Sequence, residues 1–163
     1  MKPLPSTERI NEILLYEPHT GNFYWKINSG KARIGHLAGH MRKDGYRVID
    51  IDRIKYRAHR LAFKVMHGRD PVEIDHEHGK ISDASWNLRE ATRQQNNQNV
   101  PRRKDNTSGY KGVHWVARVS KWAAMINVDG KQRELGTFAD KEAAYAAYCA
   151  AANELHGAFA RVA

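Results

Sequence analysis

The sequence predicts an α+β protein, and three features of the chain support this fold class. Short runs in which polar and apolar residues alternate occupy residues 1 to about 57, which is typical of small antiparallel strands. Residues 58–68 (AHRLAFKVMHG) place apolar side chains at helical spacing. After residue 108, strand-like runs precede an alanine-rich segment that Asp140 can cap and Gly157 can end. We therefore expect small antiparallel strands and a helix first, and a three-stranded antiparallel sheet packed on one helix last.

The composition is that of a basic protein and favours nucleic acid as its partner. A chain of 163 residues forms one ordinary domain or two small ones. Its net charge is +9 and its isoelectric point is about 9.8. A basic surface attracts polyanions through the release of counterions, whatever their sequence. Ribosomal proteins and simply cationic proteins share this composition, so charge alone leaves the partner open.

Several protein classes are excluded by the same composition. The single cysteine, Cys149, excludes an internal disulfide and a zinc site built from several cysteines. No stretch approaches the roughly 20 apolar residues of a membrane span. The N-terminal run MKPLPSTERINEILLYEP lacks the apolar segment of a signal peptide. We therefore expect a cytoplasmic protein that is not secreted and has no membrane partner. We also expect a monomer.

The central section, residues 73–99, combines strand, loop and helix signals within a short stretch. The runs VEID and NLREAT predict two strands, and the polar run HEHGKISDAS predicts the loop between them. The following run, TRQQNNQN, can begin a helix. In this interpretation Asp75 and His76 end the first strand, and Asn87 opens the second. Asn96 then lies in the first turns of the helix.

These residue types suit the hydrolysis of a phosphodiester. That reaction needs a base that takes a proton from water, a cation that neutralises phosphate charge, and a group that positions the base. Histidine titrates near the working pH, and magnesium prefers carboxylate and amide oxygens. Because neighbouring strand residues point to opposite faces, Asp75 can bind an ion while His76 faces the water. Polar loops of this composition are also common without a function, so the residues alone leave both interpretations open.

The stretches HRLAF, IDHEHG, NLREAT and QQNNQN resemble the HNH family of homing-type endonucleases, above all the subgroup carried by phages and mobile introns. The resemblance covers residues 56–99, and the earlier run LLYEPHTGNFYWK also resembles the N-terminal part of phage members. It implies a ββα-metal module that hydrolyses DNA with Mg²⁺ or another divalent ion such as Mn²⁺, without a small-molecule cofactor. It also implies that His76 is the general base, that Asn87 positions His76, and that Asp75 and Asn96 are the metal ligands.

Some residues of this section allow two interpretations. Asn97 and Asn99 are neighbours that could replace Asn96 as the metal ligand. His78 is either a loop residue or a contact to phosphate, and we expect a loop residue. His59 is expected to be a structural or helix-capping residue rather than a catalytic one.

The C-terminal section predicts a sheet with one face open to DNA. The runs KGVHWVARV, KWAAMINVDG and QRELGTF predict three strands, with Asp129 and Gly130 at a tight turn and Trp122 in the core. The open face is expected to carry seven basic, amide and aromatic side chains that could contact DNA: Lys111, His114, Trp115, Arg118, Lys121, Asn127 and Gln132. A solvated sheet face is the simpler alternative. Arg89 and Arg93 flank the central site, where they are either exposed charges or contacts to phosphate.

The pieces YKGV, LGTF and EAAYAAYCAAANELHG closely resemble the apetala/ethylene-response-factor DNA-binding domain of plants, which also occurs fused to HNH nucleases in phages. The resemblance covers nearly all of residues 108–157. It implies that the sheet lies in the major groove of double-stranded DNA. Lys111, His114 and Asn127 lie where that family usually carries arginines, so direct recognition of guanine should be weaker.

Together these features predict an HNH endonuclease in which residues 1–99 hydrolyse DNA, residues 100–107 form a linker and residues 108–163 bind duplex DNA. The alternative is a sequence-specific DNA-binding regulator that does not cut. The C-terminal section alone would support a regulator, but a regulator has no need for the combination of Asp75, His76, Asn87 and Asn96.

Overall fold

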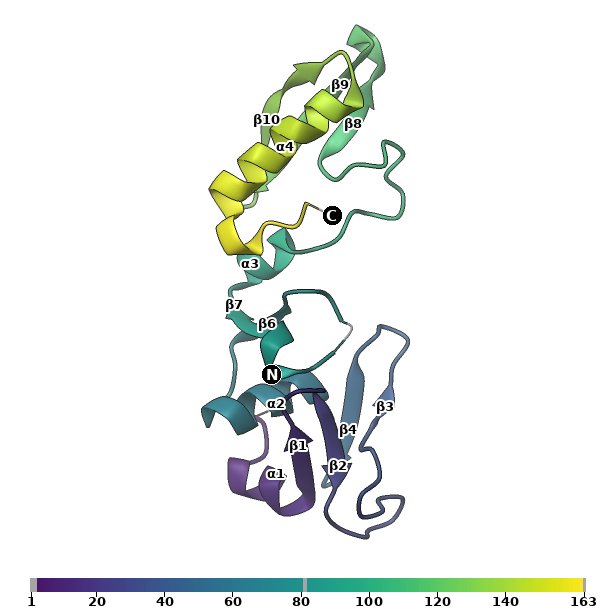
Figure 1. The fold of residues 1–163 in the computed structure, drawn as a ribbon, viewed down its shortest axis with the longest axis vertical. Helices are drawn as coiled ribbons and strands as arrows, with labels where there is room; N and C mark the ends of the chain where they lie inside the picture. The colour runs from purple at the N-terminus through teal and green to yellow at the C-terminus, as the bar shows by residue number, and fades with distance from the viewer. Residues whose placement is uncertain (1–2, 81, 163) are drawn as a thin grey trace. The chain divides into compact units, whose positions relative to one another are not determined.

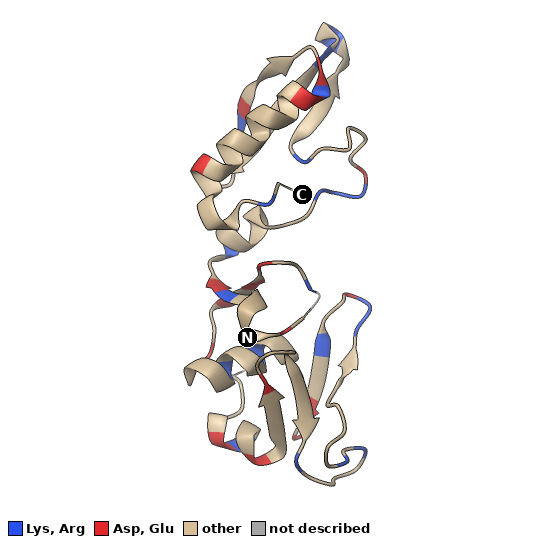
Figure 2. Ribbon diagram, viewed as in Figure 1, with Lys and Arg blue, Asp and Glu red and all other residues tan. Residues whose placement is uncertain are grey.

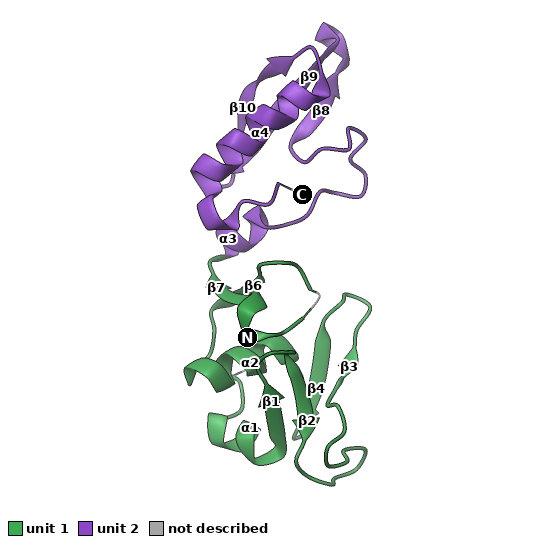
Figure 3. Cartoon of the chain, viewed as in Figure 1, with its two compact units in different colours: residues 1–92 green, residues 93–163 purple. Residues whose placement is uncertain are grey.

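The computed structural model describes residues 3–80 and 82–162. Its contacts divide the chain into two compact units, residues 1–92 and residues 93–163 (Figure 3). The sequence predicted a boundary after residue 99 and a linker of residues 100–107. In the structure, residues 93–107 belong to the second unit. The short helix at the start of this stretch, α3, makes its contacts there.

The first unit is built from small antiparallel sheets and two helices (Figure 1). Strands β1 and β2 form one sheet, strands β3, β4 and β5 form a second, and strands β6 and β7 form a third. The bounds of these elements are α1 Thr7–Ile13, β1 Leu14–Glu17, β2 Asn22–Trp25, β3 His40–Met41, β4 Arg47–Ile51, β5 Ile54–Arg57, α2 Ala58–His67, β6 Glu73–His76, η1 Ser85–Asn87 and β7 Leu88–Ala91.

Helix α1 lies in a section where the sequence predicted only strand-like runs. Ser6 caps this helix, since its hydroxyl accepts a hydrogen bond from the Arg9 amide at 3.1 Å. Ile10 and Ile13 lie on its apolar side and are buried. The serine cap and this spacing are helix signals, so the section could have been recognised as helical from the sequence.

Helix α2 confirms the predicted helix of residues 58–68. It ends at Gly68, which adopts the left-handed conformation with a φ angle of 71° that favours glycine. Its side chains Ala58, Leu61 and Ala62 are completely buried in the core of the first unit. Leu88 of β7 packs against the same core, so the β6–β7 hairpin is attached to it.

The second unit contains a three-stranded antiparallel sheet in the order β10–β9–β8, with α4 across one face (Figure 1). This confirms the three strands and the helix predicted for the C-terminal section. Ala124 and Ile126 are buried against α4, and Trp122 packs on the same core, as expected. The bounds of its elements are α3 Arg93–Gln98, β8 Val113–Val116, η2 Ala117–Val119, β9 Lys121–Val128, β10 Lys131–Phe138, α4 Lys141–His156 and η3 Gly157–Phe159.

Positive charge is distributed over both units, since lysine and arginine side chains occur along each of them (Figure 2). Within the described residues, none of the helices has the length and apolar character needed to cross a membrane.

Candidate active site

The β6–β7 hairpin carries Asp75 and His76 at its closed end. Its register pairs Asp75 with Arg89 and His76 with Leu88. Asp75 and His76 are 3% and 7% exposed, so both polar side chains are buried although they point to opposite faces of the hairpin. Buried polar side chains are costly unless they are hydrogen-bonded, and the partners of these two residues therefore define the site.

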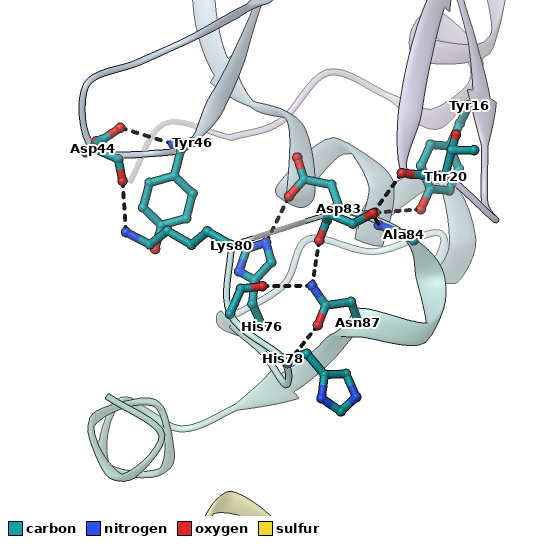
Figure 4. Close-up of polar contacts among 12 residues, drawn as sticks. Tyr16, Thr20, Asp44, Tyr46, His76, His78, Lys80, Asp83, Ala84 and Asn87 are labelled. Atoms are coloured by element: carbon teal, nitrogen blue, oxygen red, sulfur yellow. Dashed lines mark hydrogen bonds and ion pairs between the residues drawn. The ribbon is translucent and has the colours of Figure 1, made fainter. Parts of the chain in front are cut away.

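A hydrogen-bond partner of His76 is Asp83, a partly buried residue of the loop that follows β6. The Nε2 atom of His76 lies 2.8 Å from the Oδ1 atom of Asp83, and the two side chains point toward one another (Figure 4). An ionised carboxylate only accepts hydrogen bonds, so Nε2 is assigned the proton and Nδ1 the lone pair. The pair thus places an imidazole in a defined orientation and tautomer.

Asn87 holds the loop between His76 and Asp83 in place. This side chain is completely buried at the end of the 3₁₀ helix η1, directly before β7. Its Oδ1 atom accepts a hydrogen bond from the His78 amide at 2.8 Å. Its Nδ2 atom donates to the carbonyls of Gly79 and Ser82 at 2.9 and 2.7 Å (Figure 4). One amide side chain therefore binds three backbone groups of the loop, as a residue that positions His76 would need to do.

The β1–β2 hairpin packs directly against the backbone of Ser82, Asp83 and Ala84. Tyr16 donates a hydrogen bond from its hydroxyl to the Asp83 carbonyl at 2.9 Å, and Ser82 donates one to the Thr20 carbonyl at 2.8 Å. Burial raises the pKa of Tyr16, and the Asp83 charge adds to the effect, so the phenol stays a donor. Gly21 has a φ angle of 78°, and a Cβ atom there would lie 2.2 Å from the Ala84 nitrogen. Glycine is therefore required at this contact.

His59 of helix α2 lies edge-on against His76, with the ring centroids 5.0 Å apart. Burial lowers the pKa of His59 well below its usual value, and the charges of His76, Arg57, Arg60 and Lys80 act in the same direction. Its Nδ1 atom is buried and has no hydrogen-bond partner among the described residues. A structural role had been expected for His59, and its contact with His76 brings it into the site.

The ring of Tyr46 packs against both histidines. Its ring centroid lies 5.1 Å from that of His59 and 5.9 Å from that of His76. Lys80 and Arg57 stack on the same tyrosine, at 3.9 and 4.3 Å from the ring centroid. The site is therefore bordered by cations, a feature that suits the approach of a phosphate.

One group of the described side chains is arranged so that it could hold a metal ion. The structure brings His59, His76 and Asp83 together, with one ligand atom from each within 4.8 Å of the others. Imidazole nitrogens and a carboxylate oxygen are suitable donors, and the unsatisfied Nδ1 atom of His59 fits this use. The sequence predicted Asp75 and Asn96 instead. Asp75 accepts two hydrogen bonds from Arg89, from Nε at 2.9 Å and from Nη2 at 2.7 Å, as cross-strand neighbours can.

The remaining predicted residues lie in different places. Arg89 is mostly buried beside Asp75, and its Nη1 atom is also 3.8 Å from Glu77. Asn96 and Arg93 lie on helix α3, which belongs to the second unit. Their proposed roles next to Asp75 therefore stay predictions.

The sheet of the second unit exposes most of the side chains predicted to contact DNA. His114, Arg118, Lys121, Asn127 and Gln132 are exposed, whereas Lys111 is half-buried. Trp115 is 47% exposed, but the register pairs it with the core residue Trp122, and the two rings meet edge-on at 5.1 Å. Trp115 therefore lies on the α4 side of the sheet, which corrects the face assigned to it from the sequence. Partners opposite each other on neighbouring strands always share a face.

The comparison with curated proteins finds two relatives. Over 89 residues, the chain is 37% identical to Protein 3.8 of Escherichia phage T7, a match that spans 54% of this chain and 73% of that protein. The chain belongs to the same family as this phage protein. It is also 34% identical, over 122 residues, to a protein of Acanthamoeba polyphaga mimivirus described as an uncharacterized HNH endonuclease. That match spans 72% of this chain and 62% of the relative, and it supports the HNH family. No family model and no solved structure matches the chain.

Sequence reasoning missed Asp83, the residue in direct contact with His76. It lies in the run HEHGKISDAS, which was interpreted only as a polar loop. The available signal was an acidic residue four positions before Asn87. That signal is weak, because the contact between Asp83 and His76 depends on how the loop folds.

Proposed function

We propose that the chain is a divalent-metal-dependent endonuclease of the HNH family that hydrolyses phosphodiester bonds in duplex DNA. The observation that carries this proposal is the contact of the buried His76 with the partly buried Asp83, which lies in a loop that Asn87 binds at three backbone groups. The similarity to a protein named an HNH endonuclease and the net charge of +9 support it.

In this proposal His76 is the general base. The Nε2–H group of His76 donates a hydrogen bond to Asp83. The imidazole can then accept the proton of an attacking water at Nδ1. Asp83 acts through His76 and is a positioning residue. Its carboxylate keeps the ring in one orientation and stabilises the imidazolium that forms when the proton is taken up.

Asn87 has an indirect role in the same proposal. Its three hydrogen bonds hold the backbone of His78, Gly79 and Ser82, and Asp83 directly follows Ser82. Positioning a catalytic group to within a fraction of an ångström requires such support, since small displacements reduce the rate strongly.

A bound divalent ion, Mg²⁺ or Mn²⁺, would neutralise charge on the phosphate and on the departing oxygen. Asp75 would be a ligand, as the resemblance to the HNH family implies, while His76 serves as the base. The alternative set of His59, His76 and Asp83 would use His76 as a ligand and not as the base. The positive charges of Arg57, Arg60 and Lys80 close to His59 also oppose a cation there. In a Mn²⁺ titration followed by electron paramagnetic resonance, Asp75→Asn should lose binding and His59→Ala should keep it. The opposite result assigns the ion to the histidine cluster.

A cleft beside Asp83 is suited to the DNA backbone. It has a volume of about 90 Å³, and its lining includes Arg47 and Lys80 together with the polar side chains Thr20, Asn22 and Ser82. We assign the contact with phosphate to Arg47 and Lys80, because Arg89 is engaged by Asp75.

The second unit would bind duplex DNA through the open face of its sheet. Basic and amide side chains at exposed strand positions can contact phosphates and base edges. Replacing His114 and Lys121 by alanine together should weaken the binding of duplex DNA in a gel-shift assay. Unchanged affinity would remove this face from the proposed interface.

A plasmid-nicking assay tests the proposed function directly. Supercoiled plasmid incubated with the protein and Mg²⁺ should be converted to nicked or linear DNA, and EDTA should prevent the conversion. DNA binding without metal-dependent cleavage would favour the alternative of a DNA-binding regulator that does not cut.

A further inference from the structure

The second unit contains a cavity of about 570 Å³ at the end of β9. Its walls come from helix α3, the residues just before β8, strand β9, the turn between β9 and β10, and α4 with its C-terminal end. Sites for small molecules usually measure about 300–1,000 Å³ and combine apolar walls with a few polar groups. The size of the cavity is therefore that of a ligand site.

The charges around this cavity favour an anionic ligand. Arg93, Lys111 and His156 line it, and none of its described lining residues is acidic. The nearby Asp129 carboxylate accepts a hydrogen bond from Gln94 at 2.7 Å. Lys111 donates to the Gln98 carbonyl at 2.8 Å and makes no ion pair within the described chain. Burial lowers the pKa of Lys111 to about 8, with a further effect from Arg161, so the side chain is still mostly charged at neutral pH.

The uncharged part of the lining suits a flat heterocycle. Met125, Ile126 and the Tyr148 ring provide apolar surface. Amide side chains such as those of Asn127 and Gln132 lie at the same cavity, and each can both donate and accept hydrogen bonds. This combination matches the edge and faces of a nucleobase.

His156 adds a polar group that is not satisfied by the protein. Its Nε2 atom lies 2.9 Å from the Asn127 carbonyl oxygen, whereas its Nδ1 atom is buried without a hydrogen-bond partner among the described residues. With Nε2 as the donor to the carbonyl, Nδ1 is an acceptor. A buried acceptor of this kind is usually satisfied by a bound group or a water.

We propose that this cavity binds a single nucleotide, with its phosphate at Lys111 and its base among the amide side chains and Tyr148. An inorganic phosphate would fill only a small part of the volume, and a base inside a duplex is stacked and paired, so it is not available to a cavity. The nucleotide is either free in solution or an unpaired nucleotide of a DNA strand. The site lies in the second unit, uses none of the groups around His76 and goes beyond the proposed nuclease activity.

Titration calorimetry with the full chain and a deoxynucleoside monophosphate tests the proposal without cleavage. Binding should be saturable, and Lys111→Met should weaken it about 10-fold or more, as expected for a lost charge-assisted hydrogen bond. Asn127→Asp should have a similar effect, because it adds negative charge to the cavity at an exposed position that tolerates substitution. Lys141→Met is the matched control, since Lys141 begins α4 at the end opposite to His156 and should bind like the wild type.

Two duplexes in EDTA distinguish the sources of the nucleotide. One is fully paired, and the other carries a single unpaired nucleotide. Tighter binding of the second duplex, lost in Lys111→Met, identifies a nucleotide of a DNA strand as the ligand. Binding of the free nucleotide without this preference identifies a soluble nucleotide.

The proposal is overturned if neither the free nucleotide nor the unpaired nucleotide shows binding that depends on Lys111 and Asn127. It is also overturned if both variants weaken the two duplexes equally, because Lys111 would then be a general DNA contact. Plasmid nicking by the wild type is recorded separately. Cleavage without nucleotide binding refutes only the proposed nucleotide site. Nucleotide binding without cleavage refutes only the proposed nuclease activity.

Discussion

The two units place their functional side chains in opposite environments. In the first unit, Asp75, His76 and Asn87 are 3%, 7% and 0% exposed, and their hydrogen bonds go to neighbouring parts of the same unit. In the second unit, most of the predicted DNA contacts are exposed, and Lys111 lines a cavity of about 570 Å³. The two sets therefore need different tests. The function of a buried network depends on the residues that hold it in place, whereas binding by an exposed surface depends on the charges of its own side chains.

The largest expected effect is that of His76→Ala. Removal of a general base typically reduces a rate by about 10²–10⁴-fold, so plasmid nicking should fall to near background. Duplex binding in a gel-shift assay should stay within about twofold of the wild type, since His76 is buried. An equal loss of cutting and binding would show that His76 supports the fold rather than the reaction.

Gly21→Ala should destabilise the first unit by disrupting the contact between the β1–β2 turn and the Asp83–Ala84 backbone. The new Cβ atom would lie 2.2 Å from the Ala84 nitrogen, at a residue whose φ angle is 78°. We expect a loss of about 3 kcal/mol in the free energy of unfolding by urea.

Gly30→Ala is the control for this substitution. Gly30 also has a positive φ angle, 55°, but nothing lies within 4 Å of its Cβ position. It should lose only about 1 kcal/mol, the cost of the left-handed backbone. Equal losses in the two variants would mean that the contact with the Asp83–Ala84 backbone has no energetic weight.

Asp83→Asn should have a smaller effect on cutting than His76→Ala. The amide keeps the shape of the side chain but removes the charge that orients and stabilises His76. We expect a reduction in kcat of about 10–100-fold with little change in KM, measured on a fluorescent duplex. Asp83→Glu should recover part of the activity. A change in KM alone would argue for a role in substrate binding.

The smallest expected effect is the pH dependence of stability that the half-buried Lys111 causes. The pKa of Lys111 is lowered to about 8 in the folded protein, so the unfolded chain binds this proton more tightly. Burial of the charged side chain therefore costs stability below pH 8, and the free energy of unfolding should rise as the pH increases from about 8 toward the ordinary lysine value near 10.4. After a discount for solvent screening, the rise is about 1 kcal/mol. Urea unfolding of Lys111→Met should lack it, and the same rise in that variant would assign it to another group.

Local signals in the sequence predicted much of the fold. The α2 and α4 helices have terminal glycines, and Asp140 caps α4. The three strands of the second unit were recognised from strand-like runs with a turn at Asp129 and Gly130. Prediction was weaker where a signal was short: the seven-residue α1 was interpreted as part of a strand-rich section, and Trp115 was placed on the wrong face because the strand register was not known. A shift of one residue in register exchanges the faces of a strand.

The sequence by itself determined the composition of the candidate site: an acid and a histidine at a strand end, an asparagine expected to open the next strand, and a basic chain around them. The tertiary structure decided which groups these residues meet. It paired His76 with Asp83, brought His59 of α2 beside both, and engaged Asp75 with Arg89. These contacts depend on loop conformation and on packing between segments far apart in the chain, such as the turn at Gly21 against Ala84, and local sequence patterns carry no record of that packing.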